Sequence, residues 1–406
     1  MKQISVSVPG KIHFLGEHVV VYGKPALLAA IDRRCRVTIE SISKNLIEVT
    51  SKNFSVVETT NQKDLIKKAL SAKASWEKFI ENGDISYLTR ITKKELDYAC
   101  IAIGETILFY EDQQNRHSGK RSASRISKDV RDPGQVEDAR TGARMTQGFR
   151  LTIDSDIPVG AGLGSSAALA VAIAAATTLL IRHPELARHE RGRMVSGSNK
   201  IPDQVRNDIF NIAFATEQRK HGRPSGGDPA TSLYGGLVWY RRETDDVKII
   251  EPVSVVIPPS IAERFFTIHT GKPVESTGEM IAIVKKFTEK NPKKARGIFD
   301  DQEKLTREIL AAIKQNDEQQ LMNIIKHGEG NLEALGVVSI YVKKIIRDIE
   351  ESGGAAKISG GGGKTKGAGT LLVYHKEKKK LEGIVKKYGL LLDQMKLGVE
   401  GLRIES

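Results

Sequence analysis

The sequence is poor in cysteine and in aromatic residues, and each shortage excludes a class of protein. Its 406 residues include two cysteines, Cys35 and Cys100, which lie far apart and show no metal-ligand spacing. A disulfide-stapled secreted domain is therefore not expected, and the sequence favours a reduced cytoplasmic protein. Aromatic residues make up 5% of the chain and do not interleave with its basic clusters, so a stacking platform for nucleic acid is unsupported.

Long hydrophobic runs are also missing. The longest, Ala167 to Ile181, is shorter than the roughly 20 apolar residues that span a bilayer, so we expect a buried helix and no membrane partner. We expect no secretory leader, because residues 1–11 run directly into a strand-like segment without a basic-then-apolar pattern. The net charge of +13 is read as a solvated basic face that suits anionic small molecules, with no nucleic-acid partner. A homodimer is compatible with these features.

One segment, Pro158 to Ala168, is rich in glycine and hydroxyl side chains. It reads Pro-Val-Gly-Ala-Gly-Leu-Gly-Ser-Ser-Ala-Ala, after a strand-like stretch at 149–153 and before the apolar run. A strand, a glycine turn and a helix N-terminus together form an anion site, because glycine lets the backbone approach closely and the helix directs free N–H groups outward. The sequence therefore predicts a nucleotide-phosphate loop, with Ser165 and Ser166 as further phosphate or magnesium ligands.

Elsewhere the pattern alternates between strands and helices. Short strands are expected at 6–8, 19–22, 26–31, 37–40 and 47–50, with turns at Gly10, Gly16 and Gly23, followed by helices at 64–79 and 93–109. Residues 115–147 and 182–208 lack apolar periodicity and are predicted to be mobile surface insertions. A strand ending at a Pro-Pro break near residue 258 suggests a boundary between two α+β domains, 1–257 and 258–406.

Two acids follow the second insertion. Glu217 is placed on a helix, and Asp228 follows a turn of the sequence Gly-Arg-Pro-Ser-Gly-Gly. Magnesium prefers hard oxygen ligands, and phosphoryl transfer to an alcohol gains from a carboxylate that orients or accepts the hydroxyl proton. These acids can divide the two tasks, although a solvated glutamate and a turn-forming aspartate would give the same pattern.

Near the N-terminus, Pro9-Gly10-Lys11 precedes Gly16-Glu17-His18. Lys11, after a strand and a turn, can reach a phosphate as a compact positive charge. His18 is a candidate ligand contact or a structural histidine, and Glu17 is equally open.

A last glycine stretch, Ser359 to Gly367, contains Gly363-Lys364-Thr365, which resembles the end of a Walker A loop. That motif requires a glycine where this chain has Ile358, and a strand rather than a helix follows, so the P-loop interpretation is rejected. A strand–loop–strand connection beside the phosphates and a purely structural hinge remain open.

In this order the four segments resemble the motifs of the GHMP kinases. Residues 9–23 are close to the first motif, 158–168 match the phosphate loop, 217–236 are similar to the segment that carries the acids, and 357–369 take the place of the third motif. The resemblance implies an α+β fold of two domains. The N-terminal ATP- and substrate-binding domain would be ribosomal S5 domain 2-like and the C-terminal domain ferredoxin-like.

The resemblance also implies roles for individual residues. Asp228 would be the catalytic carboxylate, with Lys11 neutralising charge beside it, and Glu217 and Ser166 would be magnesium ligands. Glu17 and His18 would lie near the substrate. ATP would bind along the phosphate loop, at Pro158, Gly160, Ala161, Gly162, Leu163, Gly164, Ser165, Ser166 and Ala167.

The expected reaction is ATP- and Mg²⁺-dependent phosphorylation of a small alcohol, with the primary hydroxyl of mevalonate favoured. Phosphomevalonate, homoserine or a sugar are the alternatives, and a non-catalytic binding protein on the same scaffold is the rival from another class. One departure concerns the third motif, where Lys364, Thr365 and Lys366 interrupt the glycines. The other is the 182–208 insertion, which is expected to loop out between two intact helices.

Overall fold

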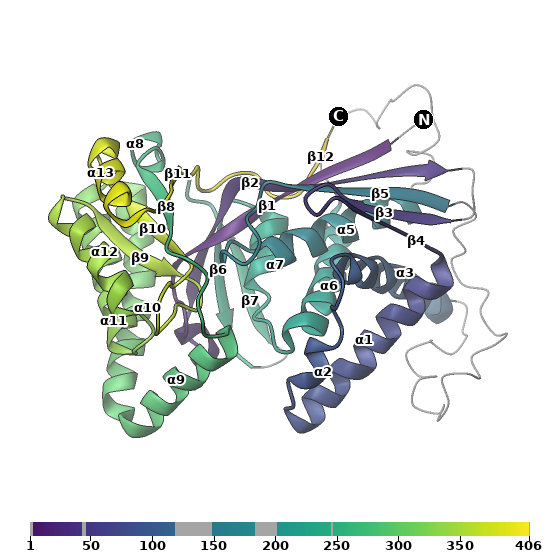
Figure 1. Ribbon diagram of the computed structural model, residues 1–406, viewed down its shortest axis with the longest axis horizontal. Coiled ribbons are helices and arrows are strands. Elements are labelled where there is room, and N and C mark those ends of the chain that lie inside the picture. The colour runs from purple at the N-terminus through teal and green to yellow at the C-terminus, as the bar shows by residue number, and fades with distance from the viewer. Residues whose placement is uncertain (1–2, 43–45, 118–147, 183–200, 245–246, 406) are drawn as a thin grey trace.

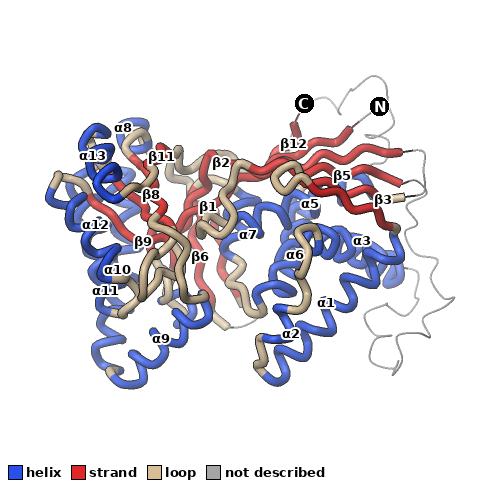
Figure 2. The backbone as a smooth tube through the Cα atoms, in the orientation of Figure 1, coloured by secondary structure: helices blue, strands red, loops and turns tan. Residues whose placement is uncertain are grey.

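The computed structural model describes residues 3–42, 46–117, 148–182, 201–244 and 247–405. Its first part is built on an eight-stranded sheet (Figures 1 and 2). Six strands follow the order β12-β1-β2-β5-β3-β4, while β6 pairs with the start of β2 and β7 pairs with β6. Its strands are β1 (Gln3–Leu15), β2 (Ala26–Ile42), β3 (Ile47–Ser51), β4 (Val56–Thr60), β5 (Gly148–Ser155), β6 (Leu237–Arg242), β7 (Lys248–Val253) and β12 (Arg403–Glu405).

Helices cover one face of this sheet (Figure 1). They are α1 (Gln62–Asn82), α2 (Ser86–Thr89), α3 (Asp97–His117), α5 (Ser165–Arg182), α6 (Asp203–His221) and α7 (Gly227–Tyr234). The apolar helix α5 packs on β1 and β2 at the centre of the main core. In the described part of the chain, α5 is the single helix long and apolar enough to cross a membrane, and 72% of it is buried inside the protein.

The second part is a four-stranded antiparallel sheet in the order β11-β8-β10-β9, covered by helices (Figure 1). The strands are β8 (Phe265–His269), β9 (Ala355–Ser359), β10 (Thr370–Tyr374) and β11 (Leu392–Gln394). The helices are α8 (Pro259–Ala262), α9 (Thr277–Lys290), α10 (Pro292–Gln315), α11 (Glu318–Ala334), α12 (Ile340–Glu351) and α13 (Lys378–Tyr388). The boundary at residue 258 stays a prediction, and β12 returns to pair with β1 of the first sheet.

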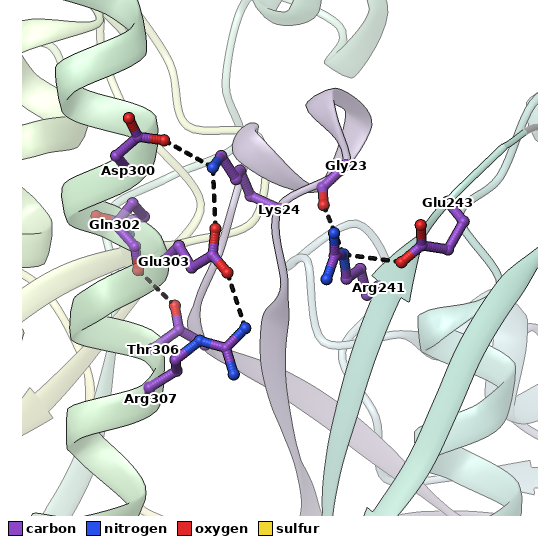
Figure 3. A network of polar contacts seen from close by, with 9 residues as sticks. All are labelled: Gly23, Lys24, Arg241, Glu243, Asp300, Gln302, Glu303, Thr306 and Arg307. Carbon is purple, nitrogen blue, oxygen red and sulfur yellow. Dashed lines mark hydrogen bonds and ion pairs between the residues drawn. The ribbon is translucent and has the colours of Figure 1, made fainter.

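Side chains join the two parts where the loop before β2 meets α10. Lys24 donates to Asp300 at 2.7 Å and to Glu303 at 2.9 Å, and Arg307 donates to Glu303 at 2.8 Å (Figure 3). On the other side of the loop, Arg241 donates to the Gly23 carbonyl at 2.9 Å (Figure 3). These contacts fix the chain that leaves the Gly16–Gly23 segment.

Most predicted strands and helices are confirmed, but the N-terminal segment differs in two respects. Val19–Tyr22, expected to be a strand, forms the 3₁₀ helix η1. Positive φ angles at Gly16, His18 and Gly23 reverse the chain around it, and this turn geometry overrides the β propensity of three valines. Gly10, expected to be a turn, is a register shift inside the continuous strand β1.

The predicted insertions lie partly outside the described residues. Residues 118–147 and 183–200 are not described, so the expected mobility there stays a prediction. The ends of both segments were wrong, because 115–117 complete α3 and 203–208 begin α6. Val205 and Asp208 are buried on α6, which shows that its first turns belong to the core.

Candidate active site

The glycine segment after β5 forms the loop that the sequence predicts. Gly160, Gly162 and Gly164 have φ angles of 78°, 79° and 74°, a region that side chains disfavour, and α5 begins at Ser165. Ala161, Leu163 and Ala167 are buried anchors, whereas Pro158, Gly160 and Gly162 are exposed and Ser165 and Ser166 half-buried. With no acidic residue in the first turn of α5, its N-terminus is suited to an anion.

Two strands hold this loop in place. The Lys11 backbone N–H in β1 donates to the Leu163 carbonyl at 2.9 Å, and the Lys11 Nζ donates to the Gly162 carbonyl at 3.2 Å. From β10 in the other sheet, the Thr370 hydroxyl donates to the Ala161 carbonyl at 2.7 Å. The loop is therefore fixed from both parts of the protein before any ligand binds.

Lys11 connects the loop to Asp228. The Lys11 Nζ lies 3.1 Å from Asp228 Oδ2, and the side chains are 4% and 30% exposed respectively. Asp228 stands in the first turn of α7, after Gly226, whose φ of 93° turns the chain into the helix. The carboxylate is thus partly open to a ligand, while the ammonium is buried between it and the loop.

A second group of side chains gathers at the end of α6. The His221 Nε2 lies 3.2 Å from Ser166 Oγ and 3.8 Å from Glu217 Oε1, so both predicted magnesium ligands contact the same imidazole. His221 was not among the predicted site residues. Its position four residues after Glu217 on a helix places both side chains on one face, and this spacing could have revealed it.

The donor set at this point fits a magnesium ion carried by a nucleotide. Mg²⁺ is usually held by one or two carboxylates together with phosphate oxygens, rather than by a cage of protein ligands. A hydroxyl and a carboxylate at the mouth of the phosphate loop supply that partial set. No group of three or more His, Cys, Asp or Glu residues in the described part of the chain could hold a metal alone.

The Gly16–His18 segment contacts the third glycine stretch. His18, with a φ of 62°, places its Nε2 at 3.0 Å from the Gly361 carbonyl, and burial lowers the pKa of its imidazole to about 4. Glu17 is buried and pairs with Lys357 of β9. The structure therefore brings His18 beside the glycine loop, and directs one oxygen of Glu17 at a buried lysine instead of an open surface.

The loop between β9 and β10 is the predicted strand–loop–strand connection. Gly362, Gly363 and Gly367 are buried, whereas the interrupting residues 364–366 are exposed. Glu275 accepts hydrogen bonds from the Lys364 backbone N–H at 3.2 Å and from the Thr365 hydroxyl. The departure from an all-glycine motif therefore lies at the tip of the loop.

Comparison with known proteins shows the family and the fold. The sequence-family model of the GHMP kinases N-terminal domain matches residues 135–236. Mevalonate kinase of Thermococcus sibiricus is 30% identical over 99% of this chain and 98% of its own length. The mevalonate kinase structure of Methanococcus jannaschii shares 17% identity, covers 99% of this chain and 98% of that one, and has a TM-score of 0.65.

Galactokinase of Lactococcus lactis, complexed with galactose, has the same fold, with a TM-score of 0.61, 14% identity, and coverage of 98% of this chain and 94% of that one. At such identities structural likeness confirms the α+β GHMP kinase fold and no more, whereas the full-length sequence match separates one kinase family from another. The chain belongs to the mevalonate kinases of the GHMP kinase superfamily.

Proposed function

We propose that this protein transfers the γ-phosphoryl group of ATP to the primary hydroxyl of mevalonate, giving 5-phosphomevalonate. The observation that carries the proposal is the placement of Lys11, whose Nζ contacts both Asp228 at 3.1 Å and the phosphate-loop carbonyl of Gly162 at 3.2 Å. A buried cation between a partly open carboxylate and an anion loop is the arrangement that transfer between those two points requires.

The residues of the chain contribute mainly position and charge. The N-terminus of α5 and the loop N–H groups would hold the phosphates, and Asp228 would orient the hydroxyl and accept its proton. Lys11 would pair with that carboxylate and offset the negative charge that develops on the transferred group. His18, neutral at physiological pH because burial lowers its pKa to about 4, donates from Nε2 to the Gly361 carbonyl, so its Nδ1 would accept a hydrogen bond from the acceptor alcohol.

Ser166 and Glu217 would hold Mg²⁺. When bound, the ion would neutralise phosphate charge and align the phosphate chain for transfer. His221 lies between the two ligands and would have to yield or share that space.

The acceptor follows from family membership rather than from the fold, since galactokinase has the same fold. We infer a reduced cytoplasmic protein, because Cys35 and Cys100 are free and burial raises the pKa of each thiol to about 12. A homodimer stays a prediction.

Release of ADP from Mg–ATP tests the function, with mevalonate, phosphomevalonate, homoserine and galactose compared as acceptors. We expect turnover on mevalonate, and a loss of roughly 10²–10⁴-fold in Asp228→Asn, the usual contribution of a positioned acid–base group. Turnover on another acceptor would move the substrate and keep the site. Failure on all four acceptors, with nucleotide still bound, would support the non-catalytic alternative.

A further inference from the structure

The carboxylate of Glu217 is held by a residue from another helix. Glu217 lies near the end of α6 with 5% of its side chain exposed. Its Oε1 accepts a hydrogen bond from the hydroxyl of Tyr98, the second residue of α3, which is 119 residues away in sequence. An oxygen of a carboxylate has two lone pairs, so Oε1 can accept this bond and still face a cation.

Tyr98 is suited to permanent donation. Its side chain is buried, and the phenol hydroxyl is the donor in the hydrogen bond to Glu217. The Lys220 ammonium lies 4.7 Å from the centre of the ring. A cation in this position is attracted by the face of the ring and so helps to hold the ring in place.

The surroundings fix the hydroxyl in space. Arg219 donates to Glu105 of α3 at 2.6 Å and stacks over the Trp76 ring of α1 at 4.8 Å. The Trp76 indole donates to the Gly222 carbonyl at 2.8 Å, just past the end of α6. These contacts fix the last turn of α6 against α1 and α3. They therefore hold the backbone of Glu217 at a constant distance from the backbone of Tyr98.

We propose that Tyr98 is a positioning residue for the metal site, and that it holds the Glu217 carboxylate in the orientation in which Glu217 and Ser166 share one divalent cation. The proposal rests on the proposed function, in which Glu217 is a magnesium ligand. Without the phenol, the carboxylate would lose the hydrogen bond that fixes its rotation. Loss of such an outer partner typically weakens a metal site 10–100-fold.

The test measures how strongly a metal tightens nucleotide binding. The dissociation constant of AMP-PNP is measured by calorimetry with Mn²⁺ and again with EDTA. The constant in EDTA divided by the constant in Mn²⁺ reports how strongly the metal site tightens nucleotide binding. We expect Tyr98→Phe to reduce this ratio about tenfold, without changing the constant in EDTA. The KM for Mg²⁺ should rise in parallel, while the KM for mevalonate stays within about twofold.

Tyr110→Phe is the matched control. Tyr110 also lies on α3 and donates to an acid of α6, Asp208, at 3.4 Å, but at the far end of both helices. We expect it to leave the ratio unchanged. An equal loss of the ratio in Tyr98→Phe and Tyr110→Phe would show that the hydrogen bond to Glu217 is not responsible.

Glu217→Gln separates the two levels of the argument. If Glu217→Gln abolishes the metal effect and Tyr98→Phe preserves it, the positioning role is refuted and the proposed function stands. If Glu217→Gln preserves the metal effect, Glu217 is not the ligand, and the metal site of the proposed function fails together with the role of Tyr98. A rise in the dissociation constant measured in EDTA for Tyr98→Phe would indicate general damage to the nucleotide site and would also refute the proposal.

Discussion

The ion pair between Glu17 and Lys357 is the most sharply testable contact between the two parts of the protein. The side chains are 1% and 0% exposed, and the ammonium also donates to the Ile358 carbonyl. Glu17 Oε2 is buried without a hydrogen-bond partner among the described residues. Replacing Lys357 by methionine keeps most of the volume and removes the charge, so Glu17 is left as a carboxylate without its cation.

The expected cost follows from that burial. Removing one partner of a fully buried pair typically lowers the free energy of unfolding by about 3–5 kcal/mol, because the remaining charge is uncompensated. Replacing both partners by apolar residues is often close to neutral. We therefore expect Lys357→Met to lose about 3–5 kcal/mol, and the double variant Glu17→Met/Lys357→Met to recover at least about 2 kcal/mol of that loss.

Guanidinium unfolding followed by circular dichroism gives these free energies, with equal slopes required across the variants. Lys52→Met is the surface control, because Lys52 pairs with Asp154 at 2.9 Å with side chains 61% and 41% exposed, and such pairs contribute at most about 1 kcal/mol. The reasoning is refuted if Lys357→Met loses no more than Lys52→Met. The single variant Glu17→Met completes the comparison. The reasoning is also refuted if the loss of unfolding free energy in the double variant equals the sum of the losses in Glu17→Met and Lys357→Met.

Three further predictions concern a buried glutamate, the phosphate loop and the Lys11–Asp228 pair. Glu329 of α11 is buried, and burial raises the pKa of its carboxyl from 4.5 to about 8. The folded protein therefore binds an extra proton between these pH values, so the free energy of unfolding falls as pH rises toward 8. Glu329→Gln should flatten this fall in denaturant titrations from pH 5 to 8.5. Gly164→Ala would place a Cβ 2.8 Å from Lys11 Cγ and should weaken AMP-PNP binding about tenfold, whereas Gly160→Ala, with a similar φ but nothing within 4 Å, should weaken it less. Lys11→Gln should lower kcat roughly 10²–10³-fold, and adding Asp228→Asn should cost much less than the product of the two effects; a fully multiplicative loss would show that the residues act independently.

The parts of the site that could be predicted from the sequence are those whose geometry is set locally. The spacing of Gly160, Gly162 and Gly164 before an apolar run is enough to predict the loop, because left-handed φ angles and a helix N-terminus follow from neighbouring residues. Local propensity failed at Val19–Tyr22, where positive φ angles on both sides override three valines. It failed again at 203–208, where polar composition hid the first turns of a helix that buries Val205.

Contacts between distant segments could not be predicted in this way. The partner of Glu17 lies 340 residues later, and the donor to Glu217 lies 119 residues earlier. No periodicity or local motif connects such pairs, since they depend on how α3 packs against α6 and how β9 passes the Gly16–His18 segment. A sequence pattern can indicate which side chains carry chemistry, but the residues that orient them become visible through tertiary packing.

The glycine loop shows why an interrupted motif need not be a damaged one. A Cβ on Gly363 would lie 2.3 Å from the Gly367 carbonyl oxygen, so the backbone segments at these two residues are in close contact. Residues 364–366 form the short exposed tip between them. Glu275 accepts hydrogen bonds from Lys364 and Thr365 of this tip, and the Ser339 hydroxyl donates to the Lys366 carbonyl. On the inner side, Gly361 contacts His18 at 3.0 Å, and Gly369 accepts the Thr270 backbone N–H at 2.8 Å. Because the buried frame and the exposed tip are held by different contacts, substitutions among 364–366 should change the surface of this loop without moving the segment that meets His18.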